Sequence, residues 1–338
     1  MKSILAALIN GESLSRDQMH VVMQAFMSGE ASAEQMAGIL VALASKGETS
    51  QEISSAAEVL RSLMVPVELS TAEPAIDIVG TGGDGANLFN VSTAACFVVA
   101  AAGIPVAKHG NVAVSSSSGS ANLFRELGLD LSLSPEQISR CVGECGIGFM
   151  FAPQHHPAMK HVAPVRKALG VRTLFNVLGP LINPARVTHH VIGVYAPELL
   201  TVMAEALRDL GSERALIVHS EDGLDELSIA APSQLAMLDH GEITLSEFNP
   251  ASLGIEGTLD PLVVTSSEQS LALIQNAFDG HDGPAADIIA LNAGAALCVA
   301  QRAGTMTEGV AMARALMKNG AAAERVRQLK AFAPITSA

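Results

Sequence analysis

Aromatic residues are the scarcest class in this 338-residue sequence, which has no tryptophan, one tyrosine and an aromatic content of 3%. Proteins that stack rings on nucleotides or sugars need such side chains. Basic residues are also few, since 20 Lys and Arg stand against 34 Asp and Glu and give a formal charge of −14. A nucleic-acid-binding surface takes much of its affinity from Lys and Arg. Both shortages therefore argue against nucleic acid as a partner, but not against a small anion.

Cysteines and long apolar runs are limited as well. The four cysteines show no CxxC spacing, which argues against a zinc site or a disulfide scaffold. No apolar run reaches the ~18 residues of a membrane span, and the start MKSILAALINGESLS turns polar too soon for a signal peptide. We therefore predict a cytoplasmic protein without a membrane partner. At about 150 residues per domain, the length predicts two domains.

The N-terminal region, residues 1–66, is predicted to be all-helical, because its apolar residues recur at three- and four-residue spacing. Ser15 and Ser32 stand where helices would begin, and Gly29 and Gly47 stand where helices would end. A second helical stretch at about residues 156–180 interrupts the strands that follow. We predict that it packs with the first 66 residues into one small helical domain, discontinuous in sequence.

From residue 76 onward, short apolar strands alternate with helices, which predicts a mostly parallel sheet. The predicted strands cover residues 76–79, 104–107, 147–151, 191–195, 215–219, 235–238 and 242–245. The predicted helices cover residues 91–102, 118–127, 134–145, 197–210, 267–279, 285–302, 306–318 and 321–331. The expected fold class is α/β, with a large domain (residues 70–155 and 185–338) whose central sheet is flanked by helices, plus the small all-helical domain.

A glycine-rich stretch, Gly80–Gly85 (GTGGDG), directly follows the first predicted strand. Glycine lets main-chain N–H groups approach a ligand closely, and open parallel sheets bind ligands at the carboxyl ends of their strands. The stretch is neither a Walker A motif nor GxGxxG. We interpret it as an anion-binding loop, completed by Asn90–Thr93 (NVST) at the start of the next helix. A plain tight turn, and Ser92 as a simple N-cap, are the alternatives.

A second donor-rich stretch follows the second predicted strand. It reads KHGN at Lys108–Asn111 and continues to residue 120 through four consecutive serines. Many N–H and O–H donors in one loop suit phosphate oxygens, whereas a solvated linker is less expected between a buried strand and a helix. Two such loops side by side predict a ligand with two separated phosphate groups, such as a diphosphate at one end and a monophosphate at the other.

An acidic doublet, Asp225–Glu226, follows the predicted strand at 215–219. Mg²⁺ prefers one or two carboxylates together with substrate phosphates and water, so the doublet predicts a magnesium site, although in isolation it would be a solvated turn. Arg166 in the helical stretch could bind a carboxylate through two hydrogen bonds, or could form a surface ion pair. The histidines at positions 155, 156, 161, 189 and 190 fit no compact zinc spacing. We interpret them as packing or surface residues.

Five motifs together resemble the anthranilate phosphoribosyltransferase family: GTGGDG at 80–85, NVST at 90–93, KHGN at 108–111, RTLFNVLGPLINPA at 172–185 and LDE at 224–226. The resemblance implies a homodimer, joined through the helical domain, that acts in tryptophan biosynthesis. Members transfer the phosphoribosyl group of phosphoribosyl pyrophosphate to anthranilate and release pyrophosphate. The resemblance also implies Mg²⁺, with two ions in each active site. It assigns no general base, because the aryl amine is already a nucleophile.

The resemblance assigns roles to individual residues in the motifs. Phosphoribosyl pyrophosphate would contact Gly80, Gly83, Asp84, Leu88, Asn90, Val91, Ser92, Thr93, Lys108, His109, Gly110, Asn111, Val112, Ala113, Val114, Ser115, Ser116 and Ser120. Anthranilate would contact Gly80, His109, Asn111 and Arg166. Magnesium would bind Ser92, Asp225 and Glu226. The sequence departs from the family at Val112, where Arg is usual, and at Asn122, where Asp is usual, so we expect weaker substrate binding or lower stability but the same reaction.

Two other functions are considered at this point. A pyrimidine nucleoside phosphorylase shares the fold and a related glycine loop, but the residues that would bind its base are not found around Lys108–Asn111. A non-enzymatic relative could bind nucleic acid with the same fold. The charge of −14 and the intact acidic doublet argue against that alternative.

Overall fold

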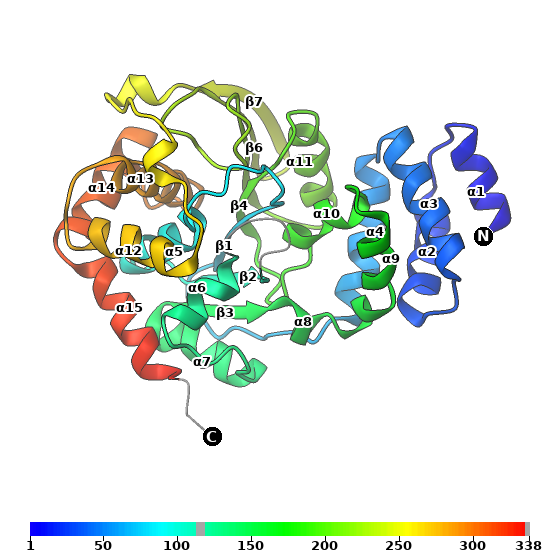
Figure 1. The fold of residues 1–338 in the computed structure, drawn as a ribbon, viewed down its shortest axis with the longest axis horizontal. Coiled ribbons are helices and arrows are strands. Elements are labelled where there is room, and N and C mark those ends of the chain that lie inside the picture. The colour runs from blue at the N-terminus through cyan, green and yellow to red at the C-terminus, as the bar shows by residue number, and fades with distance from the viewer. Residues whose placement is uncertain (113–118, 335–338) are drawn as a thin grey trace.

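The computed structural model describes residues 1–112 and 119–334. Four helices form one end of the molecule (Figure 1): α1 (Lys2–Ile9), α2 (Arg16–Ser28), α3 (Ala33–Lys46) and α4 (Ser50–Leu63). The predicted starts are confirmed, since the side chains of Ser15 and Ser32 each accept a hydrogen bond from the N–H three residues further on. The predicted ends are confirmed too, with Gly29 and Gly47 as the C-caps of α2 and α3.

The rest of the chain is built on a sheet whose described strands run in the order β3-β2-β1-β4-β5-β6-β7. Its strands are β1 (Ile76–Gly80), β2 (Val106–Gly110), β3 (Ile147–Phe151), β4 (His189–Gly193), β5 (Arg214–Ser220), β6 (Ser233–Asp239) and β7 (Glu242–Phe248). The first five strands are parallel, and β6 and β7 add an antiparallel edge. The prediction of a mostly parallel central sheet is confirmed.

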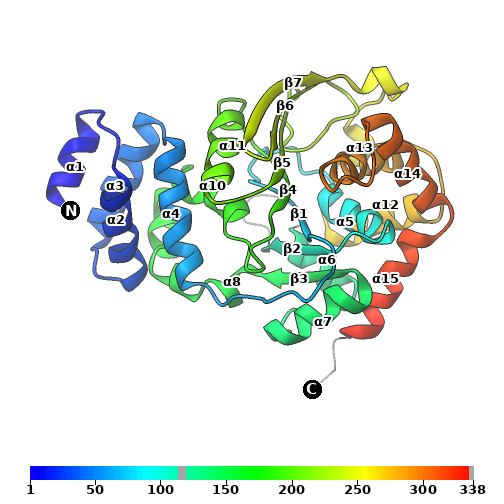
Figure 2. The ribbon, with the colours of Figure 1, turned by 180° about the vertical axis from the view of Figure 1, so that it is seen from behind.

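Helices cover both faces of this sheet. They are α5 (Val91–Ala101), α6 (Ser120–Glu126), α7 (Pro135–Cys145), α11 (Leu199–Asp209), α12 (Ser267–Phe278), α13 (Pro284–Val299), α14 (Met306–Lys318) and α15 (Ala321–Phe332), with short 3-10 turns η3 (Pro250–Leu253) and η4 (Asp260–Leu262). Helices α5 and α13, which are buried along most of their length, pack on one face together with α12, α14 and α15. Helix α11 lies on the other face (Figure 2), between the sheet and the N-terminal helices.

The predicted helical stretch contains no strand. It consists of α8 (Ala152–His155), η1 (Pro157–His161), α9 (Ala163–Leu169), α10 (Leu174–Leu178) and η2 (Gly179–Leu181). Val162 and Val165 belong to the apolar cluster formed by α1–α4, and this cluster continues to Ile192 on β4 and Ile217 on β5. The helical bundle therefore shares its core with one face of the sheet. The exact domain limits remain a prediction.

Two predicted strands are displaced along the chain. Residues 104–107 were expected to form the second strand, but β2 covers Val106–Gly110, so Lys108 and His109 lie on a strand and not in a loop. Residues 191–195 were expected as the fourth strand, but β4 covers His189–Gly193. The reason is the same in both cases, because the polar side chains that seemed to mark a boundary are buried. None of the helices in the described ranges is long and apolar enough to cross a membrane.

Candidate active site

The carboxyl ends of the parallel strands bring the predicted site together at one edge of the sheet. β1 ends at Gly80, β2 at Gly110, β4 at Gly193 and β5 at Ser220. The glycine loop follows β1 and the acidic doublet follows β5, and β4 separates these two strands in the sheet. Residues that are more than 140 positions apart in the chain meet here, as the hydrogen bond between Gly82 and Asp225 shows.

The glycine loop depends on glycine for its backbone. Gly82, Gly83 and Gly85 have φ angles of 67°, 81° and 78°, a region that side chains with a Cβ rarely adopt. The N–H of Gly82 donates a hydrogen bond of 2.7 Å to Oδ2 of Asp225. The loop is therefore a specific backbone conformation fixed to the acidic doublet, and the alternative of a plain tight turn does not explain this contact.

Two further glycines make room for Asp225. A Cβ on Gly80 would overlap the carboxylate of Asp225, and a Cβ on Gly193 would overlap its main-chain carbonyl. The sequence analysis assigned no role to Gly193, although a glycine inside the strand predicted at residues 191–195 was a usable signal. The carboxylate is thus packed directly against the ends of β1 and β4.

Glu226 contacts the start of α5. Its Oε1 accepts a hydrogen bond of 3.0 Å from the N–H of Ser92. The carboxylate occupies this N–H in the structure, and anion binding at the start of α5 stays a prediction. The alternative that Ser92 is the N-cap is wrong, since the N-cap is Asn90. The side chain of Asn90 in turn accepts a hydrogen bond of 2.8 Å from Ser270 on α12.

The charges of the doublet are poorly compensated. Burial, together with the nearby charge of Asp84, raises the pKa of Asp225 to about 7. Burial and the charge of Asp225 also raise the pKa of Glu226 well above its ordinary value. Neither carboxylate forms an ion pair with a described Lys, Arg or His residue. Buried acids that lack a counter-charge favour a cation.

The donor set fits magnesium better than a metal held by protein alone. Within residues 1–112 and 119–334, no three His, Cys, Asp or Glu side chains are grouped so as to hold a metal ion. Mg²⁺ does not require such a group, because it usually keeps one or two carboxylates and completes its octahedron with phosphates and water. Buried Asp225 and half-buried Glu226 beside the glycine loop fit that arrangement.

Lys108 lies within strand β2 and not in the loop that follows this strand. Its Nζ donates a hydrogen bond of 2.6 Å to the carbonyl of Ile78, and the residue is 2% exposed. The carboxylate of Asp77 beside it accepts hydrogen bonds from Asn183 Nδ2 (2.7 Å) and from the N–H of His109 (3.3 Å). Burial raises the pKa of Asp77 to about 6, although the charge of Lys108 opposes this shift. In this structure Lys108 supports the strands, and its contact with a phosphate remains a prediction.

The rings of His109 and His156 lie 5.1 Å apart, and both residues are buried. Nδ1 of His109 faces the carbonyl of Gly179 at 3.3 Å, so this nitrogen carries the proton. Burial, aided by His156 and His155, lowers the pKa of His109 well below its ordinary value. The site wall is therefore lined by neutral imidazoles. The packing interpretation agrees with the buried positions 155, 156, 189 and 190.

The remaining residues of the second stretch are only partly described. Asn111 is exposed; its carbonyl accepts a hydrogen bond of 3.4 Å from the hydroxyl of Ser120, and its Oδ1 one of 2.8 Å from the N–H of Val112. Val112 packs half-buried against the large core. The predicted ligand residues Ala113, Val114, Ser115 and Ser116 lie outside the described residues. Near the first loop, Val91 and Thr93 are buried in α5, and Leu88 pairs with Val263.

Arg166 lies half-buried on α9, with its guanidinium carbon 5.5 Å from the ring centroid of Phe175. Burial lowers its pKa. It forms no ion pair with any residue that the structure describes, so the alternative of a surface ion pair finds no support. A half-buried guanidinium without an acidic partner is suited to a carboxylate ligand.

Two asparagines to which the sequence analysis assigned no role form hydrogen bonds with the segments that carry the site residues. Asn292 on α13 accepts from the N–H of Leu227 and donates to its carbonyl, both at 3.0 Å, and so fixes the residue after Glu226. Asn183 donates to Asp77 and also to the carbonyl of Ala107 at 2.9 Å. Asn292 carried a signal in the sequence, because it is a lone amide in a helix that is otherwise almost wholly apolar.

Comparison with known proteins defines the class first. Residues 2–64 match the model of the glycosyl transferase family, helical bundle domain, and residues 72–323 match that of the glycosyl transferase family, a/b domain. The chain is therefore a glycosyltransferase-type enzyme with a helical bundle and an α/β domain.

Individual relatives narrow the class. The chain is 54% identical over 336 residues to the anthranilate phosphoribosyltransferase of Chromohalobacter salexigens, covering 99% of this chain and 97% of the relative. Among solved structures, the anthranilate phosphoribosyltransferase of Thermus thermophilus is 43% identical with a TM-score of 0.90, covering 97% and 98% of the two chains. That of Saccharomyces cerevisiae, solved in complex with PRPP and Mg, is 27% identical with a TM-score of 0.88, covering 98% and 96%. The chain belongs to the anthranilate phosphoribosyltransferase family.

Proposed function

We propose that the residues at the carboxyl ends of β1, β2 and β5 bind phosphoribosyl pyrophosphate with Mg²⁺, and that the chain transfers the phosphoribosyl group to anthranilate. The products are N-(5-phosphoribosyl)anthranilate and pyrophosphate, and the reaction belongs to tryptophan biosynthesis. The observation that carries the proposal is the acidic doublet, in which buried Asp225 accepts a hydrogen bond from the glycine loop and half-buried Glu226 accepts one from the start of α5. Family membership and the relative solved with PRPP and Mg support it.

The residues of the chain then have separate roles. Asp225 and Glu226 would hold magnesium, which, when bound, offsets the charge that collects on the departing diphosphate. The glycine loop brings main-chain N–H groups close to the same phosphates, since no side chains stand in the way. Arg166 would bind the carboxylate of anthranilate and so orient its amine. The amine is neutral and nucleophilic, and no residue is assigned as a general base.

We also propose two magnesium ions in each active site, one on the acidic doublet and one reached by the hydroxyl of Ser92. The yeast relative supports Mg²⁺ at such a site but not this number. Calorimetric titration of Mg²⁺ in the presence of inorganic pyrophosphate measures the stoichiometry directly. A value of one ion for each chain would contradict the second site.

The experiment that tests the reaction is the loss of anthranilate fluorescence with phosphoribosyl pyrophosphate and Mg²⁺. We expect fluorescence to fall in the presence of Mg²⁺ and to stay constant once a chelator is added. The Glu226→Gln variant is the matched control, because it keeps the volume of the side chain and removes the negative charge that would bind Mg²⁺. Constant fluorescence with the folded protein and Mg²⁺ would contradict the proposal. Ultraviolet assays with thymidine and phosphate, and gel shifts with nucleic acid, would then test the two alternatives.

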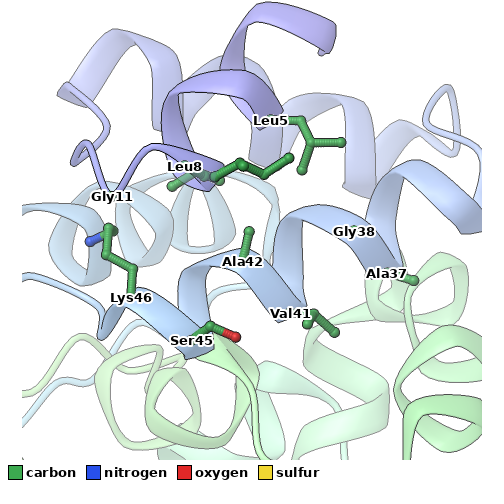
Figure 3. Close-up of a pocket in the computed structure, with 10 residues that line it drawn as sticks. Leu5, Leu8, Gly11, Ala37, Gly38, Val41, Ala42, Ser45 and Lys46 are labelled. Carbon is green, nitrogen blue, oxygen red and sulfur yellow. The ribbon is translucent and has the colours of Figure 1, made fainter.

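The second copy in the predicted homodimer would occupy an apolar groove between α1 and α3 (Figure 3). The groove has a volume of about 740 Å³ and is lined by side chains that include Leu5, Leu8 and Val41. Ile9 at its rim is 72% exposed, and exposed apolar surface of this kind is typical of an interface. We expect light scattering to give twice the mass of the chain, and Ile9→Asp to give the monomer. Leu245→Asp, at an exposed residue on β7, is the control and should leave the mass unchanged.

We place the reaction in the cytoplasm, because all four cysteines are free and two of them, Cys96 and Cys141, are fully buried. A reducing compartment suits free thiols. Fractionation of the producing cells, followed by immunoblotting, would test this location. Recovery of the protein in an extracellular or membrane fraction would contradict it.

A further inference from the structure

Arg172 connects the helical stretch to the glycine loop. It lies on the exposed turn between α9 and α10, and its Nη2 donates a hydrogen bond to the carbonyl of Gly83. Its guanidinium carbon also lies 4.0 Å from the ring centroid of Tyr195, the residue two positions after β4. One planar group thus uses its edge for a carbonyl and its face for a ring, which an ammonium group cannot do in the same way.

The partners of Arg172 are themselves tied to the phosphate side of the site. The N–H of Tyr195 donates to the hydroxyl of Thr81 at 3.2 Å, and the N–H of Thr81 donates to the carbonyl of Gly193 at 2.9 Å. The glycine loop is therefore held at two successive residues: Gly82 by the acidic doublet and Gly83 by Arg172. A ligand that shifts this loop must also shift the carbonyl that Arg172 binds.

The turn that carries Arg172 also positions Arg166. Helix α9, which bears Arg166, ends at Gly170 in the left-handed conformation with φ 62°. Helix α10 then begins with a capping box at Thr173, and its buried Phe175 lies under the guanidinium of Arg166. Only a short turn between two fixed helix ends separates the two arginines, so a displacement of one is transmitted to the other.

We propose that Arg172 is a positioning residue that couples the two substrate sites, by linking the diphosphate-side loop through Gly83 and Tyr195 to the segment that carries Arg166. Occupation of the loop then favours the placement of Arg166 that binds a carboxylate, and the coupling is reciprocal. The inference rests on the function proposed above, because it assigns the loop to the diphosphate and Arg166 to anthranilate.

Coupling can be measured at equilibrium with a pair of ligands that cannot react. Fluorescence titration gives the Kd of anthranilate with and without saturating inorganic pyrophosphate and Mg²⁺. We expect pyrophosphate to tighten anthranilate binding by about 5-fold or more in the wild type, a modest allosteric coupling. In Arg172→Met and Arg172→Lys the ratio of the two Kd values should fall to about 1, while the Kd of anthranilate alone and the Tm stay within error.

Two variants control for loss of structure or of charge in general. Tyr195→Phe keeps the ring and should keep the wild-type ratio. Arg140→Met removes another exposed arginine that lies over a ring, that of Phe332, and it too should keep the wild-type ratio. A ratio near 1 in the wild type, an unchanged ratio in Arg172→Met, or an equal weakening of both Kd values with a lower Tm would each overturn the proposal. If neither ligand binds the wild type, the proposed function itself fails, which is a different result.

Discussion

Two acidic sites at the same sheet differ in how the protein compensates their negative charge. Asp77 lies in β1 with a buried lysine beside it and with hydrogen bonds from Asn183 and from a main-chain N–H. Asp225 is buried and Glu226 is half-buried, and their carboxylates accept hydrogen bonds from the N–H groups of Gly82 and Ser92. The first site is complete within the protein, whereas the second is incomplete because it forms no ion pair with a described Lys, Arg or His. The comparison separates an acid that maintains the fold from acids that we propose to bind a ligand.

The largest expected effect is on catalysis at the incomplete site. Asp225→Asn keeps the size of the side chain and its acceptor for Gly82 but removes the charge of the proposed magnesium ligand. We expect kcat/KM to fall by about 1,000-fold, or about 4 kcal/mol of transition-state stabilisation. Without Mg²⁺ its free energy of unfolding should rise, because a buried uncompensated charge is gone. Steady-state kinetics measure kcat/KM, and urea denaturation measures the free energy of unfolding. A variant that keeps its activity and is less stable than the wild type would contradict the distinction between Asp77 and the acidic doublet.

The complete site should respond in the opposite way. Asp77→Ala leaves Lys108 buried without its counter-charge, so we expect the free energy of unfolding to fall by about 3 kcal/mol. Asp279→Ala, at an exposed acid, is the control and should change it little. Urea denaturation followed by circular dichroism gives both values. Equal stability of the two variants would show that Asp77 does not compensate Lys108.

Magnesium itself distinguishes the two sites. Binding to the folded state alone stabilises a protein by about 2.7 kcal/mol at 100 times the Kd, so Mg²⁺ with pyrophosphate should raise the Tm of the wild type. The Asp77→Asn variant should show the same increase, and Glu226→Gln should show little or none. Thermal denaturation with and without chelator tests this. An equal increase in all three proteins would place the ion elsewhere.

The smallest effect is the pH dependence of stability. The pKa of Asp77 is raised to about 6 in the folded state, so between pH 4 and pH 6 the folded protein holds a proton that the unfolded chain releases. The stability from this group is therefore present at low pH and is lost as pH rises, at about 1 kcal/mol per pH unit. Asp77→Asn should remove this contribution to the pH dependence of the free energy of unfolding and leave the contributions of other groups in place. Urea denaturation of both proteins at several pH values measures the difference.

Local patterns sufficed to predict the sheet, the helical bundle and the glycine loop after β1. Apolar periodicity marks each strand, and the serine and glycine caps of α2 and α3 are purely local signals. β2 and β4 were misplaced because Lys108 and the two histidines at 189–190 are polar yet buried, and only tertiary contacts reveal that. Asn292 and Arg172 were missed as site residues for the same reason, because their partners at Leu227 and Gly83 are distant in sequence. Local sequence thus indicated candidate ligand-binding groups, but not the residues that hold those groups in place.

The absence of a Cβ at Gly193 has an evolutionary consequence. A methyl group there would displace the main chain of Asp225 itself, and no rotamer change could relieve the overlap. Substitutions at position 193 are therefore limited by the main chain of the segment that follows β5, the neighbouring strand in the sheet. A single alanine at Gly193 would move the acidic turn away from the strand ends, and we expect the chain to keep its fold while it loses the proposed metal site.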